Sequence, residues 1–69
     1  MDGAQVKRLE TYLKAKLNPN LRLVARKETK DSVEVYLDDE FVAVAYEDTD
    51  EGEVSYSINM TVLAEDLDL

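Results

Sequence analysis

The sequence contains no cysteine and no histidine among its 69 residues. Without cysteine, neither a disulfide nor a thiolate metal site can add stability. Without histidine and cysteine, the nucleophile–base pairs that serve many hydrolases cannot be built, and no serine has an evident base beside it in the sequence. We therefore expect a non-enzymatic protein that uses no cofactor and holds no metal.

Long apolar runs are also missing, and the N-terminus does not resemble a signal peptide. No stretch approaches the roughly 20 apolar residues that cross a bilayer as a helix. We expect a cytoplasmic protein with no membrane partner. The length allows one small domain, residues 1–69, and a domain of this size has a marginal core that self-association often supports.

Basic residues are absent from the second part of the chain. Residues 1–30 hold all eight lysines and arginines and three acids, a net charge of +5, whereas residues 31–69 hold thirteen acids and no base. One interpretation is that the two parts neutralise each other within a monomer. The alternative is a basic surface for nucleic acid or another polyanion, although no nucleic-acid motif accompanies it. That surface would contain Lys7, Arg8, Lys14, Arg22, Arg26 and Lys27.

One amphipathic helix is predicted for residues 3–17. Asp2 and Gln5 have the spacing of a capping box, and Glu10 and Lys14 have that of an i,i+4 ion pair. Asn18 precedes a proline, which ends the helix. Apolar residues recur at helical spacing, with a tyrosine that widens the stripe: Val6, Leu9, Tyr12, Leu13 and Leu17.

Four strands are predicted after the helix, at residues 21–26, 33–37, 41–46 and 54–62. The last segment alternates apolar and small polar residues over nine positions, a pattern typical of a strand with one buried face. Its inward residues would be Val54, Tyr56, Ile58, Met60 and Val62. The predicted fold class is α+β, with one N-terminal helix packed on a four-stranded antiparallel sheet in the order α-β-β-β-β.

The loop between the second and third strands decides which residues share a face. If Asp38 and Asp39 form a two-residue turn, Val35 lies opposite Val42, and Tyr36 faces Phe41 on the other side. A three-residue loop would instead turn Phe41 and the two following alanines inward. We favour the first register because it gives the helix a floor rich in valine.

On the favoured register the outward sheet face is flat and largely uncharged. It is either a plain solvent face or an interface for a protein partner or a second copy, and the depletion of charge favours the interface. Its candidate residues are Tyr36, Phe41, Ala43, Ala45, Ser57 and Asn59.

The acidic stretch from Glu47 to Glu53 begins like a calcium loop, because Asp48 and Asp50 have the D-x-D spacing. Gly52 comes one residue too early for the glycine of an EF-hand, and the bidentate position falls on Asn59. The stretch is therefore interpreted as a solvated hairpin loop.

Several motifs carry a resemblance over nearly the whole chain: Arg8-Leu9-Glu10, Tyr12-Leu13, Glu34-Val35-Tyr36, Asp39-Glu40-Phe41, Glu51-Gly52-Glu53-Val54-Ser55-Tyr56 and Asp66-Leu67-Asp68. In them the chain resembles a family of short, stand-alone bacterial proteins, mainly alphaproteobacterial, known as a domain of unknown function. The resemblance implies a cytoplasmic bacterial protein and carries over no catalytic or binding residue. The expected function is a protein-interaction module that forms a homo-oligomer, with polyanion binding as the alternative.

Overall fold

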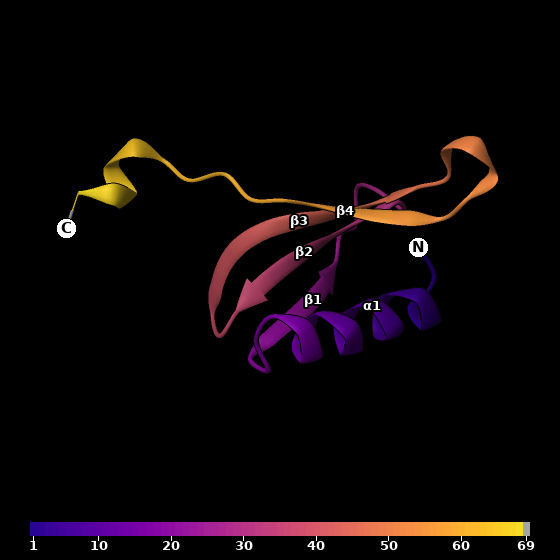
Figure 1. The fold of residues 1–69 in the computed structure, drawn as a ribbon, viewed down its shortest axis with the longest axis horizontal. Coiled ribbons are helices and arrows are strands. Elements are labelled where there is room, and N and C mark those ends of the chain that lie inside the picture. The colour runs from indigo at the N-terminus through magenta and orange to yellow at the C-terminus, as the bar shows by residue number, and fades with distance from the viewer. Residues whose placement is uncertain (69) are drawn as a thin grey trace.

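The structure is a computed structural model that describes residues 1–68, apart from the side chain of Glu51. One helix is followed by four strands (Figure 1): α1 is Gly3–Lys16, β1 is Leu21–Ala25, β2 is Ser32–Leu37, β3 is Glu40–Asp48 and β4 is Ser55–Asn59. Two short 3₁₀ turns are η1 (Asp50–Gly52) and η2 (Ala64–Leu67). The strands form one antiparallel sheet in the order β1-β2-β3-β4. The predicted α+β fold class is confirmed.

Helix α1 begins with the predicted capping box. The backbone N–H of Gln5 donates to Asp2 Oδ1 at 2.8 Å, and the N–H of Asp2 donates to Gln5 Oε1 at 2.9 Å. Two of the orphan amides at the helix start are thereby satisfied. The helix ends at Lys16, so Leu17 is its C-cap and is 69% exposed rather than part of the buried stripe. No helix in the described part of the chain is long and apolar enough to cross a membrane.

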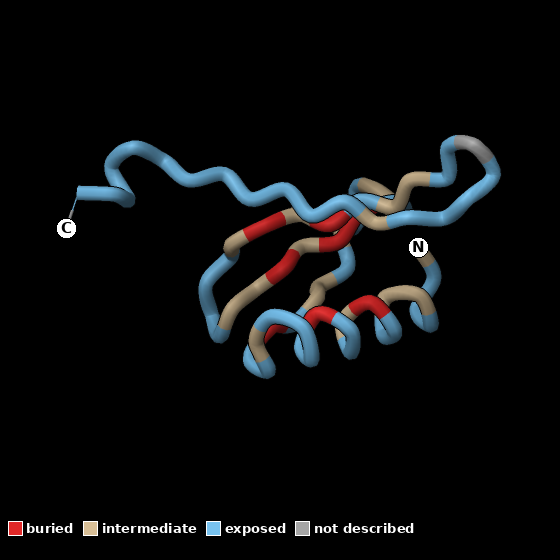
Figure 2. Tube along the Cα trace, in the orientation of Figure 1, coloured by how far each residue is buried: buried red, intermediate tan, exposed pale blue. Residues whose placement is uncertain are grey.

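The core is small and lies between α1 and the first three strands (Figure 2). A helix is about 10–12 Å wide and neighbouring strands are about 4.8 Å apart, so one helix covers about two strands. Helix α1 lies against β1, at one edge of the sheet, and β4 forms the opposite edge. The buried apolar residues are Leu9, Leu13, Leu21, Val33, Val35, Ala43 and Ala45.

The β2–β3 hairpin differs from both registers considered from the sequence. Leu37 pairs with Glu40 and Tyr36 with Phe41 across a two-residue turn, as the favoured register predicts. The register then shifts between Tyr36 and Val35, which pairs with Ala43 instead of Val42. The extra residue forms a β-bulge, in which two residues on one strand oppose one on the other.

The bulge moves the alanines of β3 to the helix side of the sheet. Ala43 is 6% exposed and Ala45 fully buried. Their predicted outward position, and hence their place in the candidate interface, is wrong. The sequence could not determine this face because residues 41–46 are apolar at both parities, so one inserted residue exchanges two equally apolar faces.

Strand β4 is shorter and more exposed than the alternation predicts. Pairing with β3 ends at Asn59, opposite Val44, and the chain then runs on past the body of the molecule (Figure 1). This extension contributes to the longest dimension of 43 Å, against 24 and 23 Å in the other directions. Of the predicted inward residues, Tyr56 is partly buried against the core. The others are exposed: Val54 57%, Ile58 39%, Met60 64% and Val62 55%.

Candidate functional site

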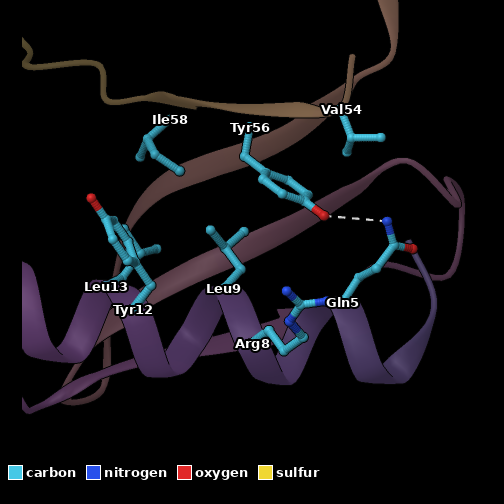
Figure 3. Close-up of a pocket in the computed structure, with 8 residues that line it drawn as sticks. All are labelled: Gln5, Arg8, Leu9, Tyr12, Leu13, Val54, Tyr56 and Ile58. Carbon is cyan, nitrogen blue, oxygen red and sulfur yellow. Dashed lines mark hydrogen bonds between the residues drawn. The ribbon is translucent and has the colours of Figure 1, made fainter. Parts of the chain in front are cut away.

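A groove of about 690 Å³ lies between α1 and β4, where the helix does not reach the edge of the sheet. Side chains from both elements point into it (Figure 3). The helix contributes Gln5, Arg8, Leu9, Tyr12 and Leu13, and the strand side contributes Val54, Tyr56 and Ile58. The groove therefore lies between the N-terminal helix and the last strand of the sheet.

Gln5 closes one end of this groove. Its side-chain amide donates to Glu47 Oε2 at 2.6 Å and to the Tyr56 hydroxyl at 3.2 Å, the second bond being drawn in Figure 3. The N-terminal amine of Met1 lies 3.6 Å from Glu47 Oε1 and also donates to the carbonyl oxygen of Lys30. These contacts fix the start of α1 to β3 and β4, since each bond joins residues far apart in the sequence.

The floor and walls of the groove are mainly apolar. Leu9 and Leu13 are buried at its base. Tyr12 and Val54 are each 57% exposed and Ile58 is 39% exposed along its sides. Among the described residues that line the groove, Arg8 is the one with a charged side chain. Such a surface suits apolar side chains of a partner, with a cation at the margin, better than it suits a polar metabolite.

The two edges of the sheet are treated differently. At β1 the backbone N–H of Leu23 points away from the sheet and donates to Glu10 Oε2 at 2.9 Å. Glu10 therefore caps a strand edge instead of forming the predicted ion pair with Lys14.

At β4, no residue that the structure describes covers the free edge in a comparable way. The backbone N–H of Glu47 donates to the carbonyl oxygen of Asp31, on the side of β2. Backbone groups along a strand point alternately to its two neighbours, so the N–H and C=O groups of Tyr46 point toward Ser57 in β4. By the same alternation, Tyr56 and Ile58 direct their N–H and C=O groups to the open edge. Strand β4 contains no charged residue and no proline. Charged residues and prolines are the usual protection of an edge strand against pairing with another chain.

Four of the predicted interface residues lie on the sheet face opposite α1. Tyr36 and Phe41 pack edge to face, with ring centroids 5.8 Å apart. Ser57 and Asn59 are exposed on the same face, paired with Tyr46 and Val44. The structure thus keeps these four on one face and separates them from Ala43 and Ala45.

The predicted polyanion contacts are distributed over several elements. Lys7 and Lys14 are exposed on α1, whereas Arg8 lines the groove. Arg22 lies on the opposite face, with its guanidinium 5.0 Å from the Tyr36 ring and 3.9 Å from Asp39 Oδ1. The remaining two, Arg26 and Lys27, follow β1 in the loop to β2.

The charge division is not neutralised by ion pairs within the described residues. Arg22 is the one described basic side chain within ion-pair distance of a carboxylate, and Asp39, its partner, is fully exposed. A pair this exposed is screened by water and contributes little to stability. The interpretation of mutual neutralisation within a monomer therefore finds little support in these contacts.

Among the side chains that the structure describes, no three carboxylates gather closely enough to hold a metal ion. In the acidic loop, η1 begins after Thr49, and Gly52 has a φ of 77°, a backbone conformation that glycine adopts without strain. Buried Ser32 shares a hydrogen bond with the hydroxyl of Thr29 rather than with a base.

Fold and groove together define a small α+β protein with one open edge strand beside an apolar groove. The chain belongs to the family described as "Protein of unknown function (DUF3126)", whose sequence model matches residues 5–66. No curated protein and no solved structure matches the chain significantly.

The sequence prediction missed the groove because it placed the inward side of residues 54–62 in the core. A geometric signal was available, since one helix of 14 residues cannot cover four strands. That signal predicts an uncovered strand but not which one. The position of α1 near β1 leaves β4 as that strand.

Proposed function

We propose that the protein is a non-catalytic interaction module that binds another polypeptide in the groove between α1 and β4. The observation that carries this proposal is the exposure of Val54, Ile58 and Tyr12 around one apolar groove. Exposed apolar side chains that gather at one groove, as these three do, often mark a binding site on a soluble protein.

The open edge of β4 supports the same proposal. An incoming extended segment would pair with the free backbone groups of Tyr56 and Ile58, as in β-strand addition. Its side chains would then contact the apolar wall of the groove. The absence of histidine and cysteine from the sequence supports a non-catalytic role, because the commonest nucleophile–base pairs cannot be assembled.

The experiment is photo-crosslinking in cells of the source organism. A benzophenone amino acid replaces Tyr12 in the groove, and in a control it replaces Tyr46, a tyrosine on the opposite sheet face. We expect protein adducts from position 12 and none from position 46. The Ile58→Lys change, made together with the probe at position 12, should remove the adducts. A probe at position 12 that captures no polypeptide contradicts the proposed function.

Polyanion binding, the alternative from the sequence, is tested separately by a mobility-shift assay at low ionic strength. We expect no shift, because Arg22 lies on the opposite sheet face from α1 and is paired with Asp39. The net charge of −8 also opposes binding. A shift with DNA or RNA that disappears steeply as salt is added would support the alternative instead.

A further inference from the structure

The segment 54–62 has the pattern of a longer strand than the one it forms. Its period-2 alternation covers nine positions, whereas β4 pairs with β3 only from Ser55 to Asn59. Met60 and Val62 continue the inward parity of Tyr56 and Ile58 but are 64% and 55% exposed. Such a pattern is typical of a strand whose apolar face is buried along its whole length.

The segment is also close to a palindrome in chemical character. Reading outward from Ile58, small polar Ser57 matches Asn59, and large Tyr56 matches Met60. Hydroxyl-bearing Ser55 then matches Thr61, and valines stand at both ends, Val54 and Val62. A sequence of this kind is complementary to itself when two copies run antiparallel, which is what a two-fold symmetric interface requires.

We propose that a second copy of this chain occupies the groove edge, with its residues 54–62 paired antiparallel to the same residues of the first copy. The proposal rests on the proposed function and names the partner for that surface. The two-fold axis passes at Ile58, so that Val54 lies opposite the partner's Val62 and Tyr56 opposite the partner's Met60. The two four-stranded sheets become one sheet of eight strands.

This register pairs the backbone groups and covers the apolar side chains that the monomer leaves exposed at β4. The outward backbone groups of Tyr56 and Ile58 gain ladder hydrogen bonds. Each exposed apolar side chain of the segment gains a cross-strand neighbour at about 4.5–5.5 Å between Cβ atoms. On the other face, only serine, threonine and asparagine meet across the interface, so no like charges are brought directly opposite one another.

The chain's own tail is a poorer occupant than a second copy. To cover β4, the tail would have to reverse direction directly after Asn59. Asn59 could begin a turn, but it is paired with Val44 in the ladder, and the next three residues, Met60, Thr61 and Val62, include no glycine, aspartate or proline that would favour a tight turn. In the structure the tail instead runs on from β4, past the helix and the other strands (Figure 1).

The net charge distinguishes self-association from polyanion binding through their salt dependence. Each copy carries a net charge of −8, so two copies repel at long range, and added salt screens this repulsion. Self-association should therefore tighten as ionic strength rises, whereas binding to a polyanion through the basic residues would weaken.

Sedimentation equilibrium of the full chain tests the proposal. We expect a reversible dimer at micromolar concentration, tighter at higher salt, and at least tenfold weaker association for Ile58→Lys. Tyr46→Lys is the matched control, because Tyr46 and Ile58 are both 39% exposed but lie on opposite faces. Circular dichroism establishes that both variants fold. A wild-type chain that remains monomeric to high micromolar concentration overturns the proposal.

Engineered cysteines test the register without relying on a destabilising change, because the chain has no cysteine of its own. Ser57 lies opposite the partner's Asn59 in a pair without ladder hydrogen bonds, with Cα atoms about 4.5 Å apart, which a disulfide can bridge. Under mild oxidation, Ser57→Cys and Asn59→Cys chains should link when mixed, and each should link poorly alone. Efficient linking of Ser57→Cys by itself overturns the proposed register.

The two proposals fail in different ways. A monomeric wild type whose position-12 probe captures a different polypeptide overturns the second copy and leaves the interaction module in place. A monomeric wild type whose probe captures nothing overturns both.

Discussion

The side-chain amide of Gln5 donates to Glu47 Oε2 at 2.6 Å, while the backbone and side-chain oxygen of the same residue complete the capping box with Asp2. Gln5 thus both helps to cap the N-terminus of α1 and attaches the helix to the third strand. Its second donor contact, to the Tyr56 hydroxyl, extends the attachment to β4. The bond between Gln5 and Tyr56 therefore connects the helix wall of the groove to its strand wall at this end.

Gln5→Ala should lower the free energy of unfolding by about 1–3 kcal/mol, because a cap and the partners of two part-buried oxygens are lost together. Gln5→Glu preserves the capping box but places a carboxylate against Glu47. It should therefore be at least as destabilising. Urea unfolding at one fixed protein concentration measures both variants. If Gln5→Glu has the same free energy of unfolding as the wild type, the capping box alone explains how this residue stabilises the fold.

Leu13→Ala should destabilise by about 2–5 kcal/mol, as large-to-small changes in a core do, because Leu13 is 6% exposed. Leu17→Ala is the control four residues later on the predicted stripe, and should change stability by less than about 0.5 kcal/mol. Thermal unfolding of the two variants compares them directly. Similar losses would mean that the helix packs beyond Lys16.

Ala45→Leu tests the bulged register of the hairpin. Ala45 is fully buried beside Val33, so the larger side chain should overpack the core and cost about 1–3 kcal/mol. Val44→Leu enlarges the neighbouring side chain on the opposite face and should cost under about 1 kcal/mol. Chemical denaturation distinguishes the two. A greater loss of stability for Val44→Leu than for Ala45→Leu would support the register without the bulge.

Asp38→Gly should raise the free energy of unfolding by about 0.5–1 kcal/mol, since Asp38 has a φ of 56°, which costs a residue with a Cβ atom. Asp39→Gly, in the same turn but without a positive φ, should instead be neutral or destabilising. Melting temperatures of the two variants give the comparison. A loss of stability in Asp38→Gly would show that the aspartate side chain contributes more than the strain costs.

The sequence by itself determined the features that depend on neighbouring residues. The capping box and the proline after Asn18 predicted both ends of α1 to within one residue. The alternating segments located all four strands, and the aspartate pair located the two-residue turn. The inward parity of Tyr56 and Ile58 was also correct, because side-chain direction alternates along any strand.

Tertiary structure decided which of those faces is covered. The bulge at Val42 turns the alanines of β3 inward, although the apolar pattern suited either face. Glu10 caps the edge amide of Leu23, a contact across 13 residues that helical spacing does not reveal. Helix α1 packs near β1 and can cover about two strands. The wall of Val54 and Ile58 is therefore left open, because a periodic pattern specifies a face to be buried but not what buries it.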